Sequence, residues 1–252
     1  MVQKVFLVVD YSGFDRFLKY PYLFVSAGVC YKNGRFYKPS ISFRPKELFL
    51  DSGAFSLIQK YNDYPYSFKQ YIAFAKILKA DYVAVMDYPC EPNSKIKLNV
   101  KERILKTVEN AQRLMDLAPE INWVFVIQGW TKEDYLYCLD VAKDHDLLTP
   151  LTAIGSVCVR KNLHEVKEIV LTIRDEIPDK IKLHCFGLDI RFAEDLAIFN
   201  SIYSFDTHAW CIYKGFPRRQ SEKFDKLAAY LKRLDKMFRL RNQTTLNFFR
   251  EG

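Results

Sequence analysis

The sequence lacks the features that define several large protein classes. Six cysteines are scattered without a C-x-x-C pair, which argues against both a disulfide framework and a structural zinc site. The longest apolar stretch, near Trp123 to Ile127, is far too short to cross a bilayer. No apolar secretory segment follows Met1. We therefore expect a cytoplasmic protein with reduced thiols and no membrane partner.

Common cofactor motifs are missing as well. No G-x-G-x-x-G follows an expected strand, and no G-x-x-x-x-G-K-[ST] occurs, so nucleotide-cofactor loops are not supported. No spacing of His, Cys and carboxylate residues is typical of a catalytic metal. The sequence therefore predicts a site that uses neither a cofactor nor a metal.

Acidic residues are scarce near the C-terminus, although the chain as a whole carries a net charge of +8. Basic residues interleaved with Tyr230, Phe238 and Phe248 suit the phosphate backbone of a nucleic acid. The alternatives are a solvated amphipathic terminal helix and a homodimer interface. The candidate nucleic-acid contacts at the start of this segment are Arg218, Arg219 and Lys223.

Short apolar runs alternate with amphipathic patterns along the chain. Helical spacing and N-caps at Asn99, Thr131 and Asn162 predict helices over 66–79, 99–117, 131–145, 162–175 and 190–199. An Asn-Gly turn predicts a hairpin at 31–37. Runs rich in β-branched and aromatic residues predict strands at 5–9, 23–28, 48–50, 82–86, 123–127, 151–155, 182–186 and 201–205.

Eight strands, mostly separated by helices, favour an α/β fold of the (β/α)8 TIM type over a doubly wound sheet. The length also allows two smaller domains, but no linker rich in Gly, Ser or Pro interrupts the pattern. We therefore expect one domain over 1–252, with a basic helical segment at about 217–252.

Most of the predicted strands end in a polar residue, which is acidic in four cases. Buried strands should stay apolar, because an unpaired charge in a core is costly. The simplest cause of a repeated exception is one shared cleft at the carboxyl ends of the strands, where sites in α/β folds are built. The strand-end residues are Asp10, Asp51, Asp87, Gln128, Gly155 with Ser156, and Asp206.

Each strand end permits a functional and a structural interpretation. Asp51 starts the tight turn DSGAF, in which it either enters the cleft or caps the next helix. Asp87 precedes two prolines that keep the chain extended, which favours a ligand contact over a cap. The amide of Gln128, next to Gly129, can both donate to and accept from a flat polar heterocycle.

Several other polar residues are weaker candidates for the site. His208 is a general base by residue type, although a single histidine beside an aromatic residue is more often structural. His184 lies in a strand pattern, for which we expect a core or surface role. Asp10 and Asp189 are further candidates.

These segments, in this order, resemble the tRNA-guanine transglycosylase superfamily. Its members have a (β/α)8 barrel with DSGGF, a strand-end Asp, QGG, an IGG segment and a late FD. Each motif is weak alone, but five in register on successive strand ends make a specific signal. Here they are DSGAF (51–55), VMD (85–87), IQG (127–129), AIGS (153–156) and SFD (204–206).

The resemblance implies a role for each matching residue. Asp206 matches the nucleophile that expels guanine and forms a covalent glycosyl-enzyme, and Asp51 matches the general acid/base. Asp87 matches the residue that reads guanine by accepting two hydrogen bonds, and Phe186 matches a position that stacks on the base. The implied base-binding residues are Asp87, Ser52, Gln128, Gly129, Gly155, Ser156 and Phe186.

The sequence also departs from the superfamily pattern. The C-x-C-x-x-C…His zinc module that follows the nucleophile is missing, since 207–252 contains only Cys211. The positions of the pattern's second glycines and of one of its cysteines are occupied by Ala54, Trp130, Ser156 and Pro89.

The missing zinc module makes the chain more similar to the transglycosylases that insert 7-deazaguanines into DNA. We expect DNA as the partner and a 7-deazaguanine, such as the cyano form, as the incoming base. The alternatives are exchange in tRNA, and a non-catalytic nucleic-acid-binding barrel with a vestigial pocket.

Overall fold

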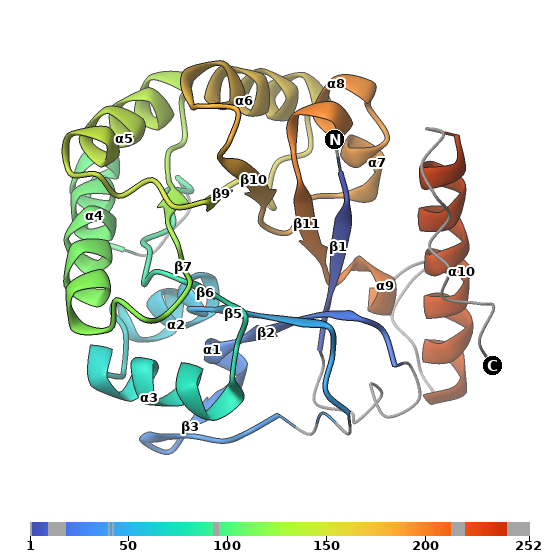
Figure 1. The fold of residues 1–252 in the computed structure, drawn as a ribbon, viewed down its shortest axis with the longest axis horizontal. Helices are drawn as coiled ribbons and strands as arrows, with labels where there is room; N and C mark the ends of the chain where they lie inside the picture. Colours follow the sequence, from blue (N-terminus) through green and yellow to red (C-terminus); the bar gives the residue numbers. More distant parts are fainter. Residues whose placement is uncertain are drawn as a thin grey trace.

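The chain forms a parallel barrel (Figure 1). The computed structural model describes residues 2–9, 19–39, 41, 43–92, 96–212 and 220–240, without the side chains of 211, 212, 220, 221 and 223. The strands of the main sheet are β1 (Lys4–Val8), β2 (Tyr22–Ser26), β5 (Glu47–Asp51), β6 (Tyr82–Ala84), β7 (Trp123–Val124), β8 (Val126–Ile127), β9 (Leu151–Ile154), β10 (Lys182–Cys185) and β11 (Ser204–Thr207).

The sheet closes on itself at Phe125. Its strand order is β7-β6-β5-β2-β1-β11-β10-β9-β8, and all of its pairings are parallel. The two edge segments, β7 and β8, are separated in sequence only by Phe125 and are therefore parts of one strand. The result is an eight-stranded closed barrel, as the sequence predicts, which excludes the doubly wound alternative.

Helices surround the strands (Figure 1). Helices α3 to α6 follow one another around the barrel, and α10 stands at one side next to α9. The helices are α1 (Ala27–Cys30), α2 (Ala54–Tyr61), α3 (Phe68–Leu78), α4 (Val100–Leu117), α5 (Lys132–Asp144), α6 (Leu163–Glu176), α7 (Ile190–Ala193), α8 (Leu196–Ser201), α9 (Ala209–Ile212) and α10 (Gln220–Arg239).

Local sequence signals explain where the outer helices begin. The side chains of Ser67, Asn99 and Thr131 each accept a hydrogen bond from the backbone N–H three residues later. In each case the side chain at that third position bonds back to the cap residue, which forms a complete capping box. Asn162 caps α6 through the backbone N–H of His164. The predicted N-caps are therefore confirmed.

Two predicted boundaries are wrong. The single helix expected over 190–199 is divided into α7 and α8, because the Asp195 side chain accepts from Ala197 and Ile198 and starts a new helix. Since α8 continues to Ser201, the final strand begins at Ser204 rather than at residue 201. The predicted hairpin is confirmed as the antiparallel pair β3 (Tyr31–Lys32) and β4 (Arg35–Phe36).

Helix α10 covers the barrel with an apolar face. Tyr230 and Phe238 are buried, the Tyr230 hydroxyl donates to Thr207, and the Phe238 ring meets Phe199 in α8. The proposed role of these two aromatic rings as part of a nucleic-acid-binding stripe is therefore wrong, because they belong to the core. None of the helices in the described ranges is long and apolar enough to span a membrane.

Candidate active site

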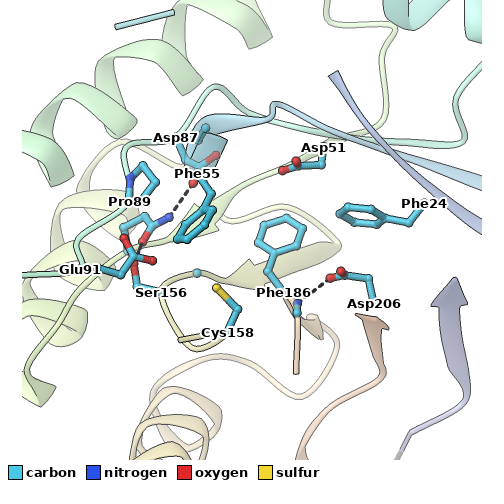
Figure 2. Close-up of a pocket in the computed structure, with 14 residues that line it drawn as sticks. Phe24, Asp51, Phe55, Asp87, Pro89, Glu91, Ser156, Cys158, Phe186 and Asp206 are labelled. Carbon is cyan, nitrogen blue, oxygen red and sulfur yellow. Dashed lines mark hydrogen bonds between the residues drawn. The ribbon is translucent and has the colours of Figure 1, made fainter. Parts of the chain in front are cut away.

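A cavity of about 200 Å³ opens at the carboxyl ends of the barrel strands (Figure 2). It lies between residues that follow β5, β6, β8, β9, β10 and the end of β11. Seven residues predicted for the site from the sequence line it: Asp51, Asp87, Gln128, Gly155, Ser156, Phe186 and Asp206. The shared cleft inferred from the strand ends is therefore present as one cavity.

Asp87 is buried and held by two donors. The Ser52 hydroxyl donates to its Oδ1 at 2.9 Å, and the Gln128 amide donates to its Oδ2 at 2.6 Å. The Tyr64 hydroxyl donates to the Asp87 carbonyl oxygen at 2.6 Å. Each carboxylate oxygen can accept two hydrogen bonds, so Asp87 keeps acceptor capacity for a ligand on both oxygens.

Gln128 is fixed from its other end. Its Oε1 accepts from the Ser156 hydroxyl at 2.7 Å, and Ser156 Oγ in turn accepts from the backbone N–H of Cys90 at 2.9 Å. Ser156 has a φ of 55°, which is unusual for a residue other than glycine and places its hydroxyl in this network. These contacts determine which end of the Gln128 amide faces Asp87.

The turn after β5 positions Asp51. Its Oδ2 accepts from the backbone N–H of Gly53 at 2.9 Å, so the carboxylate folds back over its own turn. Gly53 has a φ of 75°, and a Cβ there would lie 2.2 Å from the backbone nitrogen of Gly28. The close approach of these two glycines therefore fixes the path of the turn. The structure also places helix α2 directly behind this turn, beginning at Ala54.

Burial changes the acidity of both carboxyls. Desolvation, followed by repulsion from Asp87, raises the pKa of Asp51 to about 7. Desolvation also raises the pKa of Asp87 to about 6, against the opposing effect of its hydrogen bonds from Ser52 and Gln128. A carboxyl with a pKa near 7 can release or accept a proton at neutral pH, which suits Asp51 to general acid/base chemistry.

Asp206 lies at the opposite side of the cavity from Asp87 (Figure 2). Its Oδ1 accepts from the backbone N–H of Gly187 at 2.8 Å. The Nε2 of His184, a fully buried side chain on the neighbouring strand β10, lies 3.3 Å from the same oxygen. The His184 Nδ1 lies 2.9 Å from Ser204 Oγ, which fixes the orientation of the ring. Asp206 Oδ1 is therefore held, while the carboxylate faces the cavity.

Two phenylalanine rings project into the cavity between these carboxylates (Figure 2). Phe186 follows β10 and makes edge contacts with the rings of Phe24 and His184. Phe55, in the first turn of α2, is 47% exposed, which is unusual for a phenylalanine next to a polar site. An exposed aromatic ring at a cavity wall provides an apolar face on which a planar ligand can stack.

Glu91 is a fourth carboxyl at the cavity, and it is not among the residues predicted from the sequence. It follows the Pro89–Cys90 segment, is only 6% exposed, and its pKa is raised by burial. Its Oε2 is buried without a hydrogen-bond partner among the described residues. Leaving a buried acceptor unpaired costs roughly 1–3 kcal/mol, so this oxygen lacks a donor that a ligand could supply.

The segment that carries Glu91 is held by Arg103 of α4. The Arg103 guanidinium donates to four backbone carbonyl oxygens, those of Pro89, Glu91, Ile96 and Leu98. Arg103 is 5% exposed, so its contacts are buried, and it acts on the backbone of this segment. The position of Glu91 therefore depends on a residue one helix away.

Other residues proposed from the sequence lie away from the cavity wall. Ser52 is fully buried behind Asp87 and acts through it. Gly129 packs against Tyr135, where a Cβ would lie 2.7 Å from the backbone nitrogen. The backbone N–H of Gly155 donates to Ile127 within the sheet at 2.9 Å, so it is not directed at a ligand.

The weaker candidates have structural surroundings. Asp189 caps α7 and pairs with Arg191, and His208 is exposed beside Trp210 outside the cavity lining. The predictions for Asp10, Arg218 and Arg219 lie outside the described residues, and the side chain of Lys223 is not described either. Within the described ranges, no group of three or more His, Cys, Asp or Glu residues is arranged to hold a metal ion.

The fold and the site together define a class. A closed parallel barrel with Asp51, Asp87, Gln128 and Asp206 at successive strand ends is that of the tRNA-guanine transglycosylase superfamily. The chain matches the family model of DpdA, described as DeoxyPurine in DNA protein A, over residues 23–213. Because this match covers most of the chain, the protein belongs to the DpdA family.

A curated relative is consistent with this assignment. The chain is 24% identical over 173 residues to the tRNA-guanine(15) transglycosylase of Methanopyrus kandleri. The match covers 68% of this chain but only 37% of the relative, so the chain spans little more than a third of that protein.

Proposed function

We propose that this protein is a guanine transglycosylase that exchanges guanine in DNA for a 7-deazaguanine through a covalent intermediate on Asp206. The observation that carries the proposal is the convergence of Asp51, Asp87 and Asp206 on one cavity, each held in a different hydrogen-bonding environment. Membership of the DpdA family supports both the base-exchange chemistry and DNA as the polymer.

Asp87 and Gln128 are the proposed readers of the base. The free acceptor sites of Asp87 take the ring N1–H and the exocyclic amine of guanine, which adenine does not present in the same arrangement. The second N–H of the Gln128 amide donates to the carbonyl oxygen O6, since its first is bonded to Asp87. The rings of Phe55 and Phe186 stack on the base. Because Gly155 N–H is used in the sheet, the backbone donor at this wall is assigned to Ser156.

Asp206 and Asp51 are the proposed catalytic pair. An oxygen of Asp206 attacks the anomeric carbon, the bond to the base nitrogen breaks, and the departing guanine takes a proton from Asp51. The incoming base then gives its N9 proton to Asp51 and attacks the same carbon, which releases Asp206. This sequence uses Asp51 once as an acid and once as a base, so a pKa of about 7 suits both steps.

His184 and Gly187 are the proposed positioning residues for Asp206. Both lie against Oδ1, which leaves Oδ2 as the attacking atom. The target nucleotide has to leave its base stack to reach a cavity of this kind.

The test is exchange of labelled guanine into duplex DNA and, in parallel, into tRNA. We expect label to enter DNA, and we expect a protein–DNA adduct that survives denaturation when no incoming base is supplied. Asp206→Asn should abolish both, because an amide cannot act as the nucleophile. Asp179→Asn, at a fully exposed carboxylate, is the matched control and should behave as the wild type.

Each alternative has its own outcome in this experiment. Entry of label into tRNA alone would assign the protein to the tRNA reaction. Binding of guanine without exchange into either polymer would favour the non-catalytic barrel. An Asp206→Asn variant with full exchange activity would exclude the covalent mechanism.

A further inference from the structure

Glu91 is a cavity carboxyl to which the proposed exchange chemistry gives no task. It lines the same cavity as the three aspartates, it is more than nine-tenths buried, and its Oε2 has no hydrogen-bond partner among the described residues. A buried carboxylate normally has a donor or a cation as its partner. The empty position beside Glu91 Oε2 is therefore shaped for a donor that comes with a ligand.

The two nearest arginines do not neutralise Glu91 by direct pairing. Arg103 spends its guanidinium on backbone carbonyls, and Arg160 bonds to the carbonyls of Trp130 and Ser156 and to the Glu165 carboxylate. Neither forms an ion pair with Glu91 within the described residues. No lysine or arginine lines the described cavity, which instead collects four carboxyl groups. A positively charged ligand group complements such a cavity.

The order of polar groups along the cavity indicates which part of a base meets Glu91. Asp87 bonds to Gln128, Gln128 to Ser156, and the Ser156 hydroxyl is within hydrogen-bonding reach of Glu91. Around the edge of guanine, N1 and the amine are followed by O6, and O6 is followed by position 7. If Asp87 reads N1 and Gln128 reads O6, the next group along this wall faces position 7. Glu91 and Ser156 lie together at that side of Figure 2.

We propose that Glu91 selects the incoming base by binding a cationic amine carried on position 7 of a 7-deazaguanine. This inference rests on the proposed function, since it takes the base orientation from Asp87 and Gln128. It goes beyond that function by assigning the substituent: the amine of an aminomethyl group donates to Glu91 Oε2 and supplies the missing positive charge. A neutral cyano group offers neither a donor nor a charge.

The experiment compares incorporation of three bases that differ only at position 7: 7-aminomethyl-, 7-methyl- and 7-cyano-7-deazaguanine. In the wild-type protein we expect kcat/KM for the aminomethyl base to exceed that for the methyl base by about tenfold or more. In Glu91→Gln, which keeps the shape but not the charge, the ratio between these two bases should fall toward one. Glu165→Gln is the matched control, because it removes a carboxylate that also neighbours Arg160 but lies outside the cavity lining.

Guanine exchange in the same samples separates this inference from the function on which it rests. Because guanine carries no substituent, its exchange reports the proposed function alone. Absence of guanine exchange in the wild type would remove the function. Guanine exchange accompanied by a preference for the cyano or methyl base would remove only the role of Glu91. If Glu91→Gln is poorly folded, binding of the three bases to the wild type, followed as thermal shifts, tests the same order of preference.

Discussion

Asp51 sits in surroundings that oppose its own charge. Its ordinary pKa of 3.8 is raised to about 7 in the folded protein, chiefly because burial disfavours the ionised form. The folded state therefore holds a proton on Asp51 over a pH range in which the unfolded chain has already lost it. The stability associated with this proton is fully present below pH 3.8 and is lost as the pH rises through 7.

Asp51→Asn should remove this loss of stability at high pH. We expect the melting temperature of the variant to exceed that of the wild type at pH 8 by roughly 3 °C or more, and to match it near pH 4. Calorimetry across this pH range, with Asp179→Asn as the control, measures the difference. An equal difference at both pH values would mean that a lost hydrogen bond, not the charge of Asp51, controls the stability.

The residues that could be predicted for the site are those whose polarity interrupts a strand. Asp51, Asp87 and Asp206 each follow a short apolar run, and this contrast is visible in one dimension. His184 sits within a strand and reaches Asp206 only because β10 and β11 pair in parallel. Glu91 follows no strand directly, since a segment fixed by Arg103 brings it to the cavity. Contacts of this kind depend on the assembled barrel and leave no local signal.

At the scale of elements, the loop after β9 shows how closely two strand ends must approach. A Cβ on Gly155 would lie 2.3 Å from Gln128 Nε2, so only glycine allows the amide to lie across the backbone at this position. The neighbouring Ser156 accepts a left-handed backbone conformation and uses its hydroxyl to hold the other end of the amide. The two residues together position Gln128.

Gly155→Ala should therefore impair base binding more than folding. The new methyl group displaces the end of a side chain rather than a backbone, and the displaced amide loses its bond to Asp87. We expect KM for guanine to rise by about tenfold, corresponding to the loss of one charge-assisted hydrogen bond. Steady-state exchange kinetics measure this effect. Gly34→Ala is the control for a strained glycine with no atom within 4 Å, and a similar KM change there would contradict the explanation.

Element boundaries followed from the sequence where a cap or a turn marks them. The capping boxes at Ser67, Asn99 and Thr131 and the Asn-Gly hairpin are local, and they lie where the sequence predicts them. The division of one predicted helix at Asp195 was missed, because the apolar pattern continues on both sides of the new cap. The start of β11 moved with it.

At the scale of the whole molecule, α10 contributes to the core despite its charge. Leu227, Leu234 and Tyr230 are buried, while Lys232 and Lys236 on the opposite face are exposed. Composition predicted a basic helix here, but only the packed barrel decides which of its faces is covered. Both the amphipathic interpretation and a phosphate-binding role of the exposed face remain compatible with this arrangement.

Leu234→Ala should destabilise the barrel as a core substitution does. Leu234 is fully buried, so we expect a loss of roughly 2–5 kcal/mol in the free energy of unfolding. Urea denaturation measures this value, and Lys232→Ala, two residues away on the exposed face, should change it by less than about 0.5 kcal/mol. Equal effects of the two substitutions would show that α10 is not docked through this face.

The closing strand of the barrel changes partners at Phe125, pairing with β6 before it and with β9 after it. The bond between Asp87, which follows β6, and Gln128, which follows β8, spans that change of partners. A base held between these two side chains would act as a fastener across the joint of the barrel. Occupancy of the cavity and integrity of the ring are then one equilibrium, and the bound base becomes part of the protein's architecture for as long as it stays.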